Sequence, residues 1–529
     1  MIRNLQNSLR GRPWSGVLMP ALFAFLLAMF PTLLVGIPVP IIEDEWGYLL
    51  SADTFCQGRL SNPTHEHWTL LESVHQMQVP SYQSKYPPGQ ALFLAAGQLI
   101  WHPILGVWLS VAFMIGAIVW MLQAFLPRRW SWLGGSIAAA LYVVLGEPFV
   151  GGTHGYWSQS YWGGAVAAGG GALVFGAVAR LVKRPRIWTS VTMALGLLLL
   201  ANTRPMEGLL ASLPLGLVLV QQLVRRGWTS YLWVRVVLPA VLILSIGFAG
   251  MLRYNQAVTG DARTMPWTVH YEQYCIFPLF IWQETLPDKD WHHPELAVFY
   301  GKVERGMHER HKTPGGLAFA TASKIYRFWR FYLGPIFLLP FLVGAWSFRR
   351  LPLAWASLAS IALVLGSNLI KFGSPPHYSA PITALVIALI VAGLRQLWSW
   401  RRAETWSGKR VVFALLGLGL AHTAWGLKLS VDNVHRTHRE LRYKATQELL
   451  VSPGKDLVFV SYGPLHREGE HWIWNDADID SSEIVWIRDP GPEERAKVQA
   501  DFPGRKVWLS EVEYEARSYR LIPLGTSGP

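Results

Sequence analysis

The chain has 529 residues, of which 51% are apolar and only 15% are charged, and its formal net charge is +13. Several apolar runs reach the roughly 20 residues that cross about 30 Å of hydrocarbon, so the composition predicts a membrane protein. The positive charge does not indicate a nucleic-acid partner, because arginine and lysine recur in short clusters between apolar runs, as in polytopic membrane proteins.

The first apolar run, at about 15–38, follows Arg3, Arg10 and Arg12. It is too long for the apolar core of a signal peptide, and no cleavage site of small residues follows it. We therefore expect a signal anchor with the N-terminus in the cytoplasm.

Further apolar runs bring the predicted number of transmembrane helices to about eleven. With the N-terminus inside, every basic cluster between these runs falls in the cytoplasm, which supports this orientation. Segment 89–103 is expected to be a re-entrant or interfacial helix. The predicted spans are about 15–38, 105–126, 131–149, 162–182, 187–203, 206–223, 232–251, 329–348, 351–370, 379–396 and 411–429.

This topology places segments 39–104, 150–161, 252–328 and everything after about 430 outside the cytoplasm. Both cysteines, Cys56 and Cys275, lie in these outer segments. A disulfide between them is compatible with an oxidising compartment, and two unpaired thiols are equally compatible with the sequence.

The composition changes near residue 430, where short β-rich runs replace the long apolar ones. Three runs predict strands, and Pro492–Asp501 predicts a helix. We therefore expect two domains. Residues 1–430 form an all-α, polytopic transmembrane domain, and residues 431–529 form a small α/β domain outside the cytoplasm. The predicted strands are Asp456–Tyr462, Ile484–Ile487 and Lys506–Leu509.

Three consecutive acidic residues, Glu43, Asp44 and Glu45, follow the first predicted span directly. Ionised groups are costly at the edge of the hydrocarbon layer, so they suggest a general base or a metal ligand. The alternative is a solvated start of a loop. About forty residues on, Lys85 precedes a rigid Pro87-Pro88 turn and could bind phosphate, although a lysine that snorkels to the interface would show the same pattern.

These motifs resemble the GT-C superfamily of integral-membrane glycosyltransferases, in particular the protein O-mannosyltransferase and aminoarabinose-transferase group. The resemblance rests on a D-E-x-x-Y-L-L motif that begins at Asp44 and a K-x-P-P-G motif that begins at Lys85. Two further matches are Thr203-Arg204-Pro205-Met206-Glu207-Gly208 and His377-Tyr378-Ser379-Ala380-Pro381. The resemblance to this superfamily covers roughly residues 15–400.

The resemblance implies an enzyme that transfers a sugar from a polyprenyl-phosphate carrier to an acceptor outside the cytoplasm, with inversion. Asp44 would be the general base, with Glu45 as the neighbouring candidate. Lys85 would neutralise the leaving phosphate, and Tyr86 lies in the same motif. A positioned carboxylate makes an alcohol nucleophilic, and a phosphate leaving group needs a cation.

The second outer loop departs from the family pattern, because it lacks the aspartate that relatives usually carry. Glu147 or His154 could replace this acid, and Gln159 could hydrogen-bond substrate. Arg204 and Glu207 are expected to form a structural ion pair or to bind phosphate. His377 and Tyr378 are candidates for the lining of the carrier site.

The expected partners are a polyprenyl-phosphate-linked sugar, an acceptor that is a lipid, a glycan or a protein, and the lipids of a bacterial inner membrane. No cofactor is implied, and a divalent metal stays open. No set of metal ligands is identified, since His292-His293 has no spaced third ligand and is expected to be a solvated pair. Two other functions stay open: a flippase for lipid-linked sugars, and an inactive relative that binds glycans.

Overall fold

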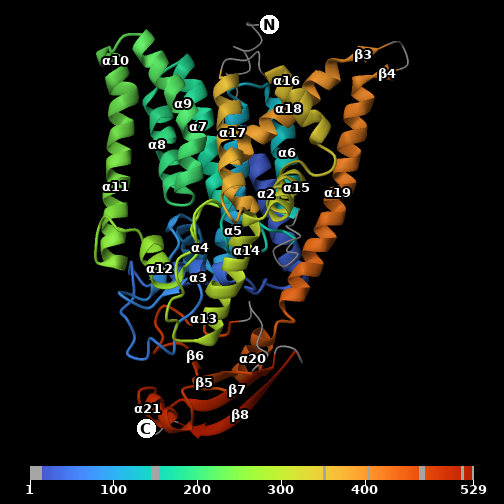
Figure 1. The fold of residues 1–529 in the computed structure, drawn as a ribbon. Helices are drawn as coiled ribbons and strands as arrows, with labels where there is room; N and C mark the ends of the chain where they lie inside the picture. The colour runs from blue at the N-terminus through green and yellow to red at the C-terminus, as the bar shows by residue number, and fades with distance from the viewer. Residues whose placement is uncertain are drawn as a thin grey trace. The chain divides into compact units, whose positions relative to one another are not determined.

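The computed structural model describes residues 15–144, 154–348, 353–402, 406–463, 471–513 and 517–526 (Figure 1). They divide into two compact units. The first unit contains Met1–Ile37, Ile104–Gly250 and Pro314–Asn433, and the second contains Pro38–Pro103, Met251–Thr313 and Val434–Pro529. The first unit thus ends close to the predicted domain boundary at 430. Two polar loops that were assigned to the membrane domain group with the C-terminal segment instead.

Helices make up almost all of the first unit. Its elements are α2 (Ser15–Val35), α5 (Pro103–Leu122), α6 (Arg128–Val144), α7 (Ala165–Lys183), α8 (Ile187–Ala201), α9 (Pro205–Arg225), α10 (Ser230–Leu232), η1 (Trp233–Val237), α11 (Leu238–Thr259), α15 (Pro314–Phe328), η4 (Trp329–Leu333), α16 (Leu338–Phe348), α17 (Ala354–Ile370), η5 (Pro376–Ile382), α18 (Thr383–Ser399), β3 (Arg401–Arg402), β4 (Trp406–Ser407) and α19 (Gly408–Thr437). The ends of α5, α11 and α19 continue into the second unit.

Seven helical segments of the described residues are long and apolar enough to cross a membrane. An eighth candidate is the pair Pro314–Leu333 and Leu338–Ser347, which is bent by 89°. The chain is therefore a multi-pass membrane protein, as predicted. Each of the eleven predicted spans overlaps a helix, but α6, α8 and α17, as described, are not among these candidates, so the number eleven stays a prediction.

Glycines allow the helices of the first unit to approach one another closely. A Cβ atom on Gly170 of α7 would lie 3.1 Å from the carbonyl oxygen of Gly196 of α8, and one on Gly196 would lie 2.8 Å from that of Gly170. Small residues thus serve close helix packing at this contact. In Figure 1, α7, α8 and α9 lie side by side.

The second unit combines two loops with the C-terminal segment. We call residues 38–103 the first loop and residues 251–313 the long loop. The first loop contains α3 (Glu43–Cys56), β1 (Gln76–Met77), β2 (Gln83–Ser84) and α4 (Gly89–Ile100), and the long loop contains α12 (Pro266–Tyr274), α13 (Pro294–Val298), η2 (Phe299–Glu304), α14 (Arg305–Glu309) and η3 (Arg310–Lys312). At 12 residues, α4 is too short to span a bilayer, which fits the re-entrant or interfacial helix expected there.

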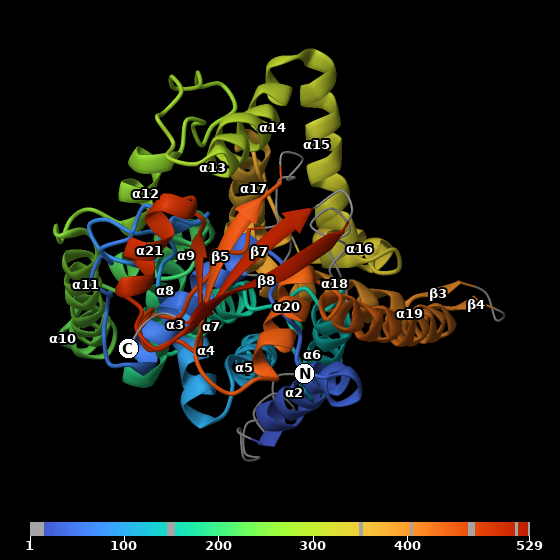
Figure 2. The same ribbon diagram turned by 90° about the horizontal axis from the view of Figure 1, so that it is seen from below.

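The C-terminal segment forms the predicted α/β domain. It contains α20 (Leu441–Leu450), β5 (Asp456–Tyr462), β6 (Ile484–Arg488), α21 (Pro492–Ala500), β7 (Lys506–Glu513) and β8 (Ser518–Thr526). The strand order is β6-β5-β7-β8, with β5 parallel to β6 and β7, and β8 antiparallel to β7. Figure 2 shows β5, β7 and β8 side by side. The fold class expected from the sequence is therefore confirmed.

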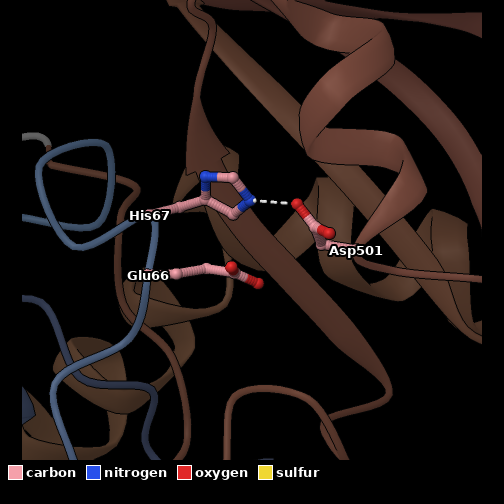
Figure 3. A group of neighbouring side chains, drawn as sticks. All are labelled: Glu66, His67 and Asp501. Carbon is pink, nitrogen blue, oxygen red and sulfur yellow. Dashed lines mark hydrogen bonds and ion pairs between the residues drawn. The ribbon is translucent and has the colours of Figure 1, made fainter.

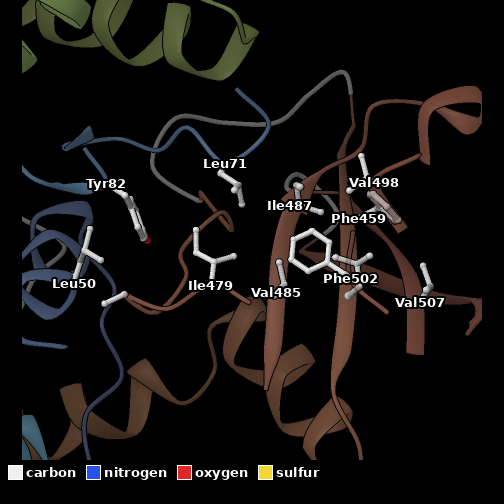
Figure 4. Close-up of a cluster of buried hydrophobic side chains, with 12 residues drawn as sticks. Leu50, Leu71, Tyr82, Phe459, Ile479, Val485, Ile487, Val498, Phe502 and Val507 are labelled. Atoms are coloured by element: carbon white, nitrogen blue, oxygen red, sulfur yellow. The ribbon is translucent and has the colours of Figure 1, made fainter. Parts of the chain in front are cut away.

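One hydrophobic cluster joins the first loop to this sheet. Leu50, Leu71 and Tyr82 of the first loop pack with strand residues such as Phe459 and with Phe502 after α21 (Figure 4). Because these apolar side chains are removed from water together, the first loop and the C-terminal sheet stabilise each other.

The two cysteines are free thiols in the structure. Cys56 Sγ lies 3.5 Å from the carbonyl oxygen of Ala95, and Cys275 Sγ lies 3.9 Å from His270 Nδ1. Of the two alternatives left open by the sequence, the structure therefore has the unpaired one.

Candidate functional site

The three acidic residues after the first span begin helix α3, and they have different roles. Glu45 is buried, and its Oε2 accepts hydrogen bonds from the backbone N–H groups of Ile41 at 2.9 Å and Ile42 at 3.1 Å. Negative charge is favourable in the first turn of a helix, where N–H groups lack partners. These contacts of Glu45 cap the helix, and its catalytic role stays a prediction.

Asp44 is partly exposed, with 28% of its side chain accessible. The Tyr86 hydroxyl donates a short hydrogen bond to Asp44 Oδ1. The Tyr86 ring in turn stacks on Tyr48, one helical turn after Asp44, with ring centroids 4.5 Å apart. The structure therefore brings together two predicted site residues, Asp44 and Tyr86. Tyr86 contacts Oδ1 of Asp44, so the second carboxylate oxygen, Oδ2, is not engaged by this hydrogen bond.

Lys85 reaches the same place through the hairpin of β1 and β2. Gln76 pairs with Ser84 in this hairpin, so the residues just outside the pair, His75 and Lys85, meet. The Lys85 N–H donates to the His75 carbonyl oxygen at 3.3 Å, and Lys85 Nζ lies 2.8 Å from His75 Nδ1. The hairpin fixes the position of the lysine that the sequence predicted to bind phosphate.

His75 lies between the two predicted catalytic groups and was not predicted. Its Nε2 lies 4.0 Å from Asp44 Oδ2, and its backbone N–H donates to the Tyr300 hydroxyl at 3.1 Å. Burial, and next the charge of Lys85, hold the pKa of His75 well below its usual value. A protonated lysine has no acceptor, so Nδ1 accepts and the ring proton lies on Nε2, toward Asp44.

Two further carboxyl groups, both half-buried, complete the surroundings. Desolvation raises the pKa of Glu43 to about 8, and the charges of Asp44 and Glu304 contribute to this shift. Burial also raises the pKa of Glu304, at the end of η2, to about 8, where Lys85 opposes the effect and Asp44 adds to it. Both groups therefore hold a proton at neutral pH to a large extent. Glu304 was not predicted, because nothing in the sequence relates the long loop to Asp44.

The first unit gathers a different set of predicted residues. Glu207 of α9 forms a buried ion pair with Lys371, which follows α17. The Arg204 guanidinium and Lys371 Nζ lie 4.5 and 4.6 Å from the centre of the Tyr378 ring. Folding thus brings Lys371, a lysine from a distant segment, to the Glu207 carboxylate. The predicted roles of Arg204 and Glu207, a structural ion pair or phosphate binding, stay predictions.

His377 belongs to the same part of the first unit. Its Nδ1 lies 2.7 Å from the Tyr156 hydroxyl, and the two rings are stacked. Tyr156, Trp157, Tyr161 and Trp162 are all buried. They therefore pack inside the unit.

The other described candidates of the second outer loop form hydrogen bonds to neighbouring helices. Gln159 Oε1 accepts from Thr32 Oγ1 at 3.1 Å, and its Nε2 donates to the Ala28 carbonyl oxygen, so this side chain ties the loop to α2. The carbonyl oxygen of His154 accepts from Asn433 Nδ2 at 3.3 Å. Glu147 lies outside the described residues.

The histidine pair of the long loop contacts the first loop, although the His292 side chain stays 52% exposed, in part as predicted. His292 Nδ1 lies 2.8 Å from Oε2 of the buried Glu72, and His293 Nε2 lies 2.6 Å from the Thr69 carbonyl oxygen. The Tyr274 hydroxyl donates to the other Glu72 oxygen at 2.8 Å. Glu72 therefore fastens the long loop to the first loop, which the sequence could not show.

One group of the described residues has the composition of a metal site. One ligand atom each from Glu66, His67 and Asp501 lies within 4.8 Å of the others (Figure 3). His67 Nε2 is 2.9 Å from Asp501 Oδ2, and Glu66 and Asp501 are exposed. The contact between His67 and Asp501 links the first loop to the residue after α21.

No protein-family model and no curated protein matches the chain. Similar solved structures include ArnT from Cupriavidus metallidurans in the apo state, at 15% identity and a TM-score of 0.49, with 93% of this chain and 92% of that chain covered. The same protein bound to undecaprenyl phosphate gives 15% identity, a TM-score of 0.47 and 94% coverage of each chain. An oligosaccharyltransferase from Archaeoglobus fulgidus gives 11% identity and a TM-score of 0.41, with 91% and 64% covered. These neighbours are GT-C fold glycosyltransferases, the superfamily that the motifs resemble.

Proposed function

We propose that this protein is a membrane glycosyltransferase. It moves a sugar from a polyprenyl-phosphate carrier to an acceptor hydroxyl on the extracytoplasmic side and inverts the anomeric carbon. The observation that carries the proposal is the arrangement of Lys85, His75 and Asp44, in which one imidazole ring lies between a cation and a carboxylate.

Asp44 is the general base. The Tyr86 hydroxyl holds Oδ1, so Oδ2 is the oxygen that takes the proton from the acceptor hydroxyl. The acceptor oxygen attacks the anomeric carbon from the face opposite the carrier, and the bond from that carbon to the phosphate oxygen breaks. A single displacement of this kind inverts the anomeric configuration. The proton stays on Asp44, and the bond electrons leave with the phosphate.

Lys85 stabilises the leaving group. Charge accumulates on the phosphate as the bond breaks, and a fixed ammonium lowers the barrier only if it is already in place. The hairpin and His75 hold the Lys85 ammonium in place. The backbone hydrogen bond to the His75 carbonyl oxygen fixes the position of the Lys85 backbone, and the contact with His75 Nδ1 orients Nζ. The polyprenyl phosphate is then released with its negative charge compensated.

Arg204, Glu207, His377 and Tyr378 remain the proposed carrier-binding residues of the first unit. Two cations near one aromatic ring, of which Lys371 is neutralised by Glu207, form a group that suits a phosphate ester and its isoprenoid chain. For the other predicted residues, His154 and Gln159, the contacts described above favour a structural role.

The test is a transfer assay with the purified chain in proteoliposomes. Undecaprenyl phosphate carrying a ¹⁴C-labelled hexose or pentose is supplied together with extracted membrane lipids and glycans as acceptors. Release of undecaprenyl phosphate together with a new labelled product supports the proposal. Movement of intact labelled lipid across the bilayer would show a flippase instead, and binding of the donor without product would show an inactive relative.

A further inference from the structure

A cavity of about 420 Å³ lies in the second unit, away from the contacts of Asp44. Its walls come from α3, from α20 and from the segment between Trp474 and Trp486. The volume is within the roughly 300–1,000 Å³ of small-molecule sites. At its edge, Leu450 is 47% exposed and Glu483 is also exposed, so a ligand can enter from solvent.

Aromatic rings form the apolar part of the wall. Trp46 of α3 stacks on Trp474, with centroids 5.7 Å apart and planes 8° apart. The Arg442 guanidinium lies 4.5 Å from the centre of the Trp46 ring and 5.1 Å from that of Trp486. Arg442 also donates to the carbonyl oxygens of Trp472 at 3.0 Å and Trp474 at 2.8 Å, so this wall is rigid before a ligand arrives.

The polar part of the wall has an excess of negative charge. Among the described residues that line the cavity, Asp53, Asp476 and Glu483 are acidic and Arg442 is the one cation. Burial, and next the charge of Asp53, raise the pKa of Asp476, and even with a proton on it two carboxylates face one guanidinium. Such a wall accepts hydrogen bonds from hydroxyl and ammonium groups and repels phosphate and carboxylate.

The cavity shares its helix with the proposed base. Trp46, Leu49 and Asp53 are spaced three and four residues apart and thus lie on one face of α3, while Asp44 and Tyr48 lie on the face that contacts Tyr86. A second cavity of about 50 Å³ shares Trp46, Arg442 and Trp474 with the first and reaches Glu43, the first residue of α3.

We propose that the larger cavity is a carbohydrate subsite that holds one or two sugar rings of an uncharged or amine-bearing glycan. Aliphatic wall residues such as Leu49 and Leu450 contact the C–H faces of the rings, while the packed tryptophans hold the wall in place, and the carboxylates accept from the hydroxyls. Its role as the acceptor subsite rests on the proposed glycosyltransferase function, but its binding of sugar does not.

Binding is measured without any donor, so that it is independent of catalysis. The full-length protein in nanodiscs is titrated with cellobiose, with the glucosamine disaccharide of chitosan and with glucose 6-phosphate, and tryptophan fluorescence is followed. We expect saturable binding of both disaccharides, tighter for the amine-bearing one, and none of the phosphorylated sugar. Tighter binding of glucose 6-phosphate, or no binding of any of the three, would overturn the proposal.

Two pairs of variants locate the binding. Thr446→Phe fills the cavity from α20, and its control Gln447→Phe adds the same ring at the next, exposed position. Glu483→Gln removes one wall charge, and its control is Glu493→Gln on the exposed part of α21. We expect at least a tenfold loss of affinity in Thr446→Phe and a selective loss for the amine-bearing disaccharide in Glu483→Gln. Equal effects in variant and control would place the binding elsewhere.

The two proposals fail separately. If the wild type binds the disaccharides through this wall but transfers no sugar, the proposed subsite is supported and the proposed glycosyltransferase function is contradicted. If it transfers sugar and Thr446→Phe has an unchanged KM for the acceptor, the subsite has no acceptor role. We expect the acceptor KM of Thr446→Phe to rise at least tenfold with an unchanged KM for the donor.

Discussion

The side chain of Lys85 ends 2.8 Å from Nδ1 of His75, and the other ring nitrogen of His75 lies 4.0 Å from Asp44. One neutral imidazole therefore contacts the phosphate-binding candidate and faces the candidate base. Neither group has to pair with the other directly, which would neutralise both. This separation keeps a carboxylate basic and a cation available within one small site.

Asp44→Asn tests the base. The amide keeps the size of the side chain and can still accept from Tyr86, but it cannot take a proton at neutral pH. We expect transfer to fall by about 10²–10⁴-fold, the usual effect of removing a general base, with unchanged donor binding. Initial rates and donor affinity of the purified variant measure this.

The neighbouring carboxyl groups are the controls for Asp44. Glu43 holds a proton at neutral pH to a large extent, so Glu43→Gln should change the rate little. Glu45→Gln should act mainly on stability, because Glu45 caps α3. Normal turnover in Asp44→Asn together with collapse in Glu45→Gln would move the base by one residue.

His75 is a positioning residue, and its replacement should act on the donor. His75 has φ of 64°, a region that asparagine also adopts, so His75→Asn keeps the backbone but shortens the side chain. We expect kcat/KM to fall about ten- to a hundredfold, as for the loss of a hydrogen bond to a charged group. The KM for the donor should rise while the KM for the acceptor stays. His75→Gln, which offers a carbonyl oxygen to Lys85, should recover part of the loss, and equal KM changes for both substrates would contradict this role.

The sequence predicted the elements that have strong local signals. Asp456–Tyr462 is a strand with the predicted bounds, because a continuous apolar run between turn residues favours a buried strand. Strand β8 was missed, since its residues are mostly exposed and it contains Pro523, which only an edge strand tolerates. His75 and Glu304 were missed for a different reason. His75 reaches Asp44 through a hairpin whose strands have two residues each, and Glu304 reaches it from a distant loop. Neither arrangement leaves a local pattern in the sequence.

Both cysteines should react as thiols. Cys275 is buried, which raises its pKa to about 12, and burial raises that of the half-buried Cys56 as well. We expect the denatured, unreduced chain to take up two alkyl groups by mass, and the native chain to react faster at Cys56. An unreduced chain that takes up none would show a disulfide and contradict the structure.

The orientation of the chain in the membrane can be tested with reporter fusions. If the basic clusters lie inside, fusions after Arg186 and Arg226 should report the cytoplasm. Fusions after Pro63, Glu284 and Gly454 should report the opposite side, and the last three positions all belong to the second unit. An external signal after Arg226 would invert the topology and place the proposed site in the cytoplasm.

Glu304 should make the stability of the protein depend on pH in an unusual direction. Its pKa is about 8 in the folded chain and near 4.5 in an unfolded one, so between these values the folded chain holds a proton that the unfolded chain has lost. Stability from this group is therefore complete below about pH 4.5 and declines as the pH rises through 8. Glu304→Gln cannot lose the proton, so its thermal midpoint should match the wild type at pH 5 and exceed it at pH 8.5. Glu309→Gln, on the exposed side of α14, is the matched control and should follow the wild type at both pH values. A Glu304→Gln variant that is less stable than the wild type at pH 8.5 would show that the carboxylate is ionised beside Lys85 in the folded protein.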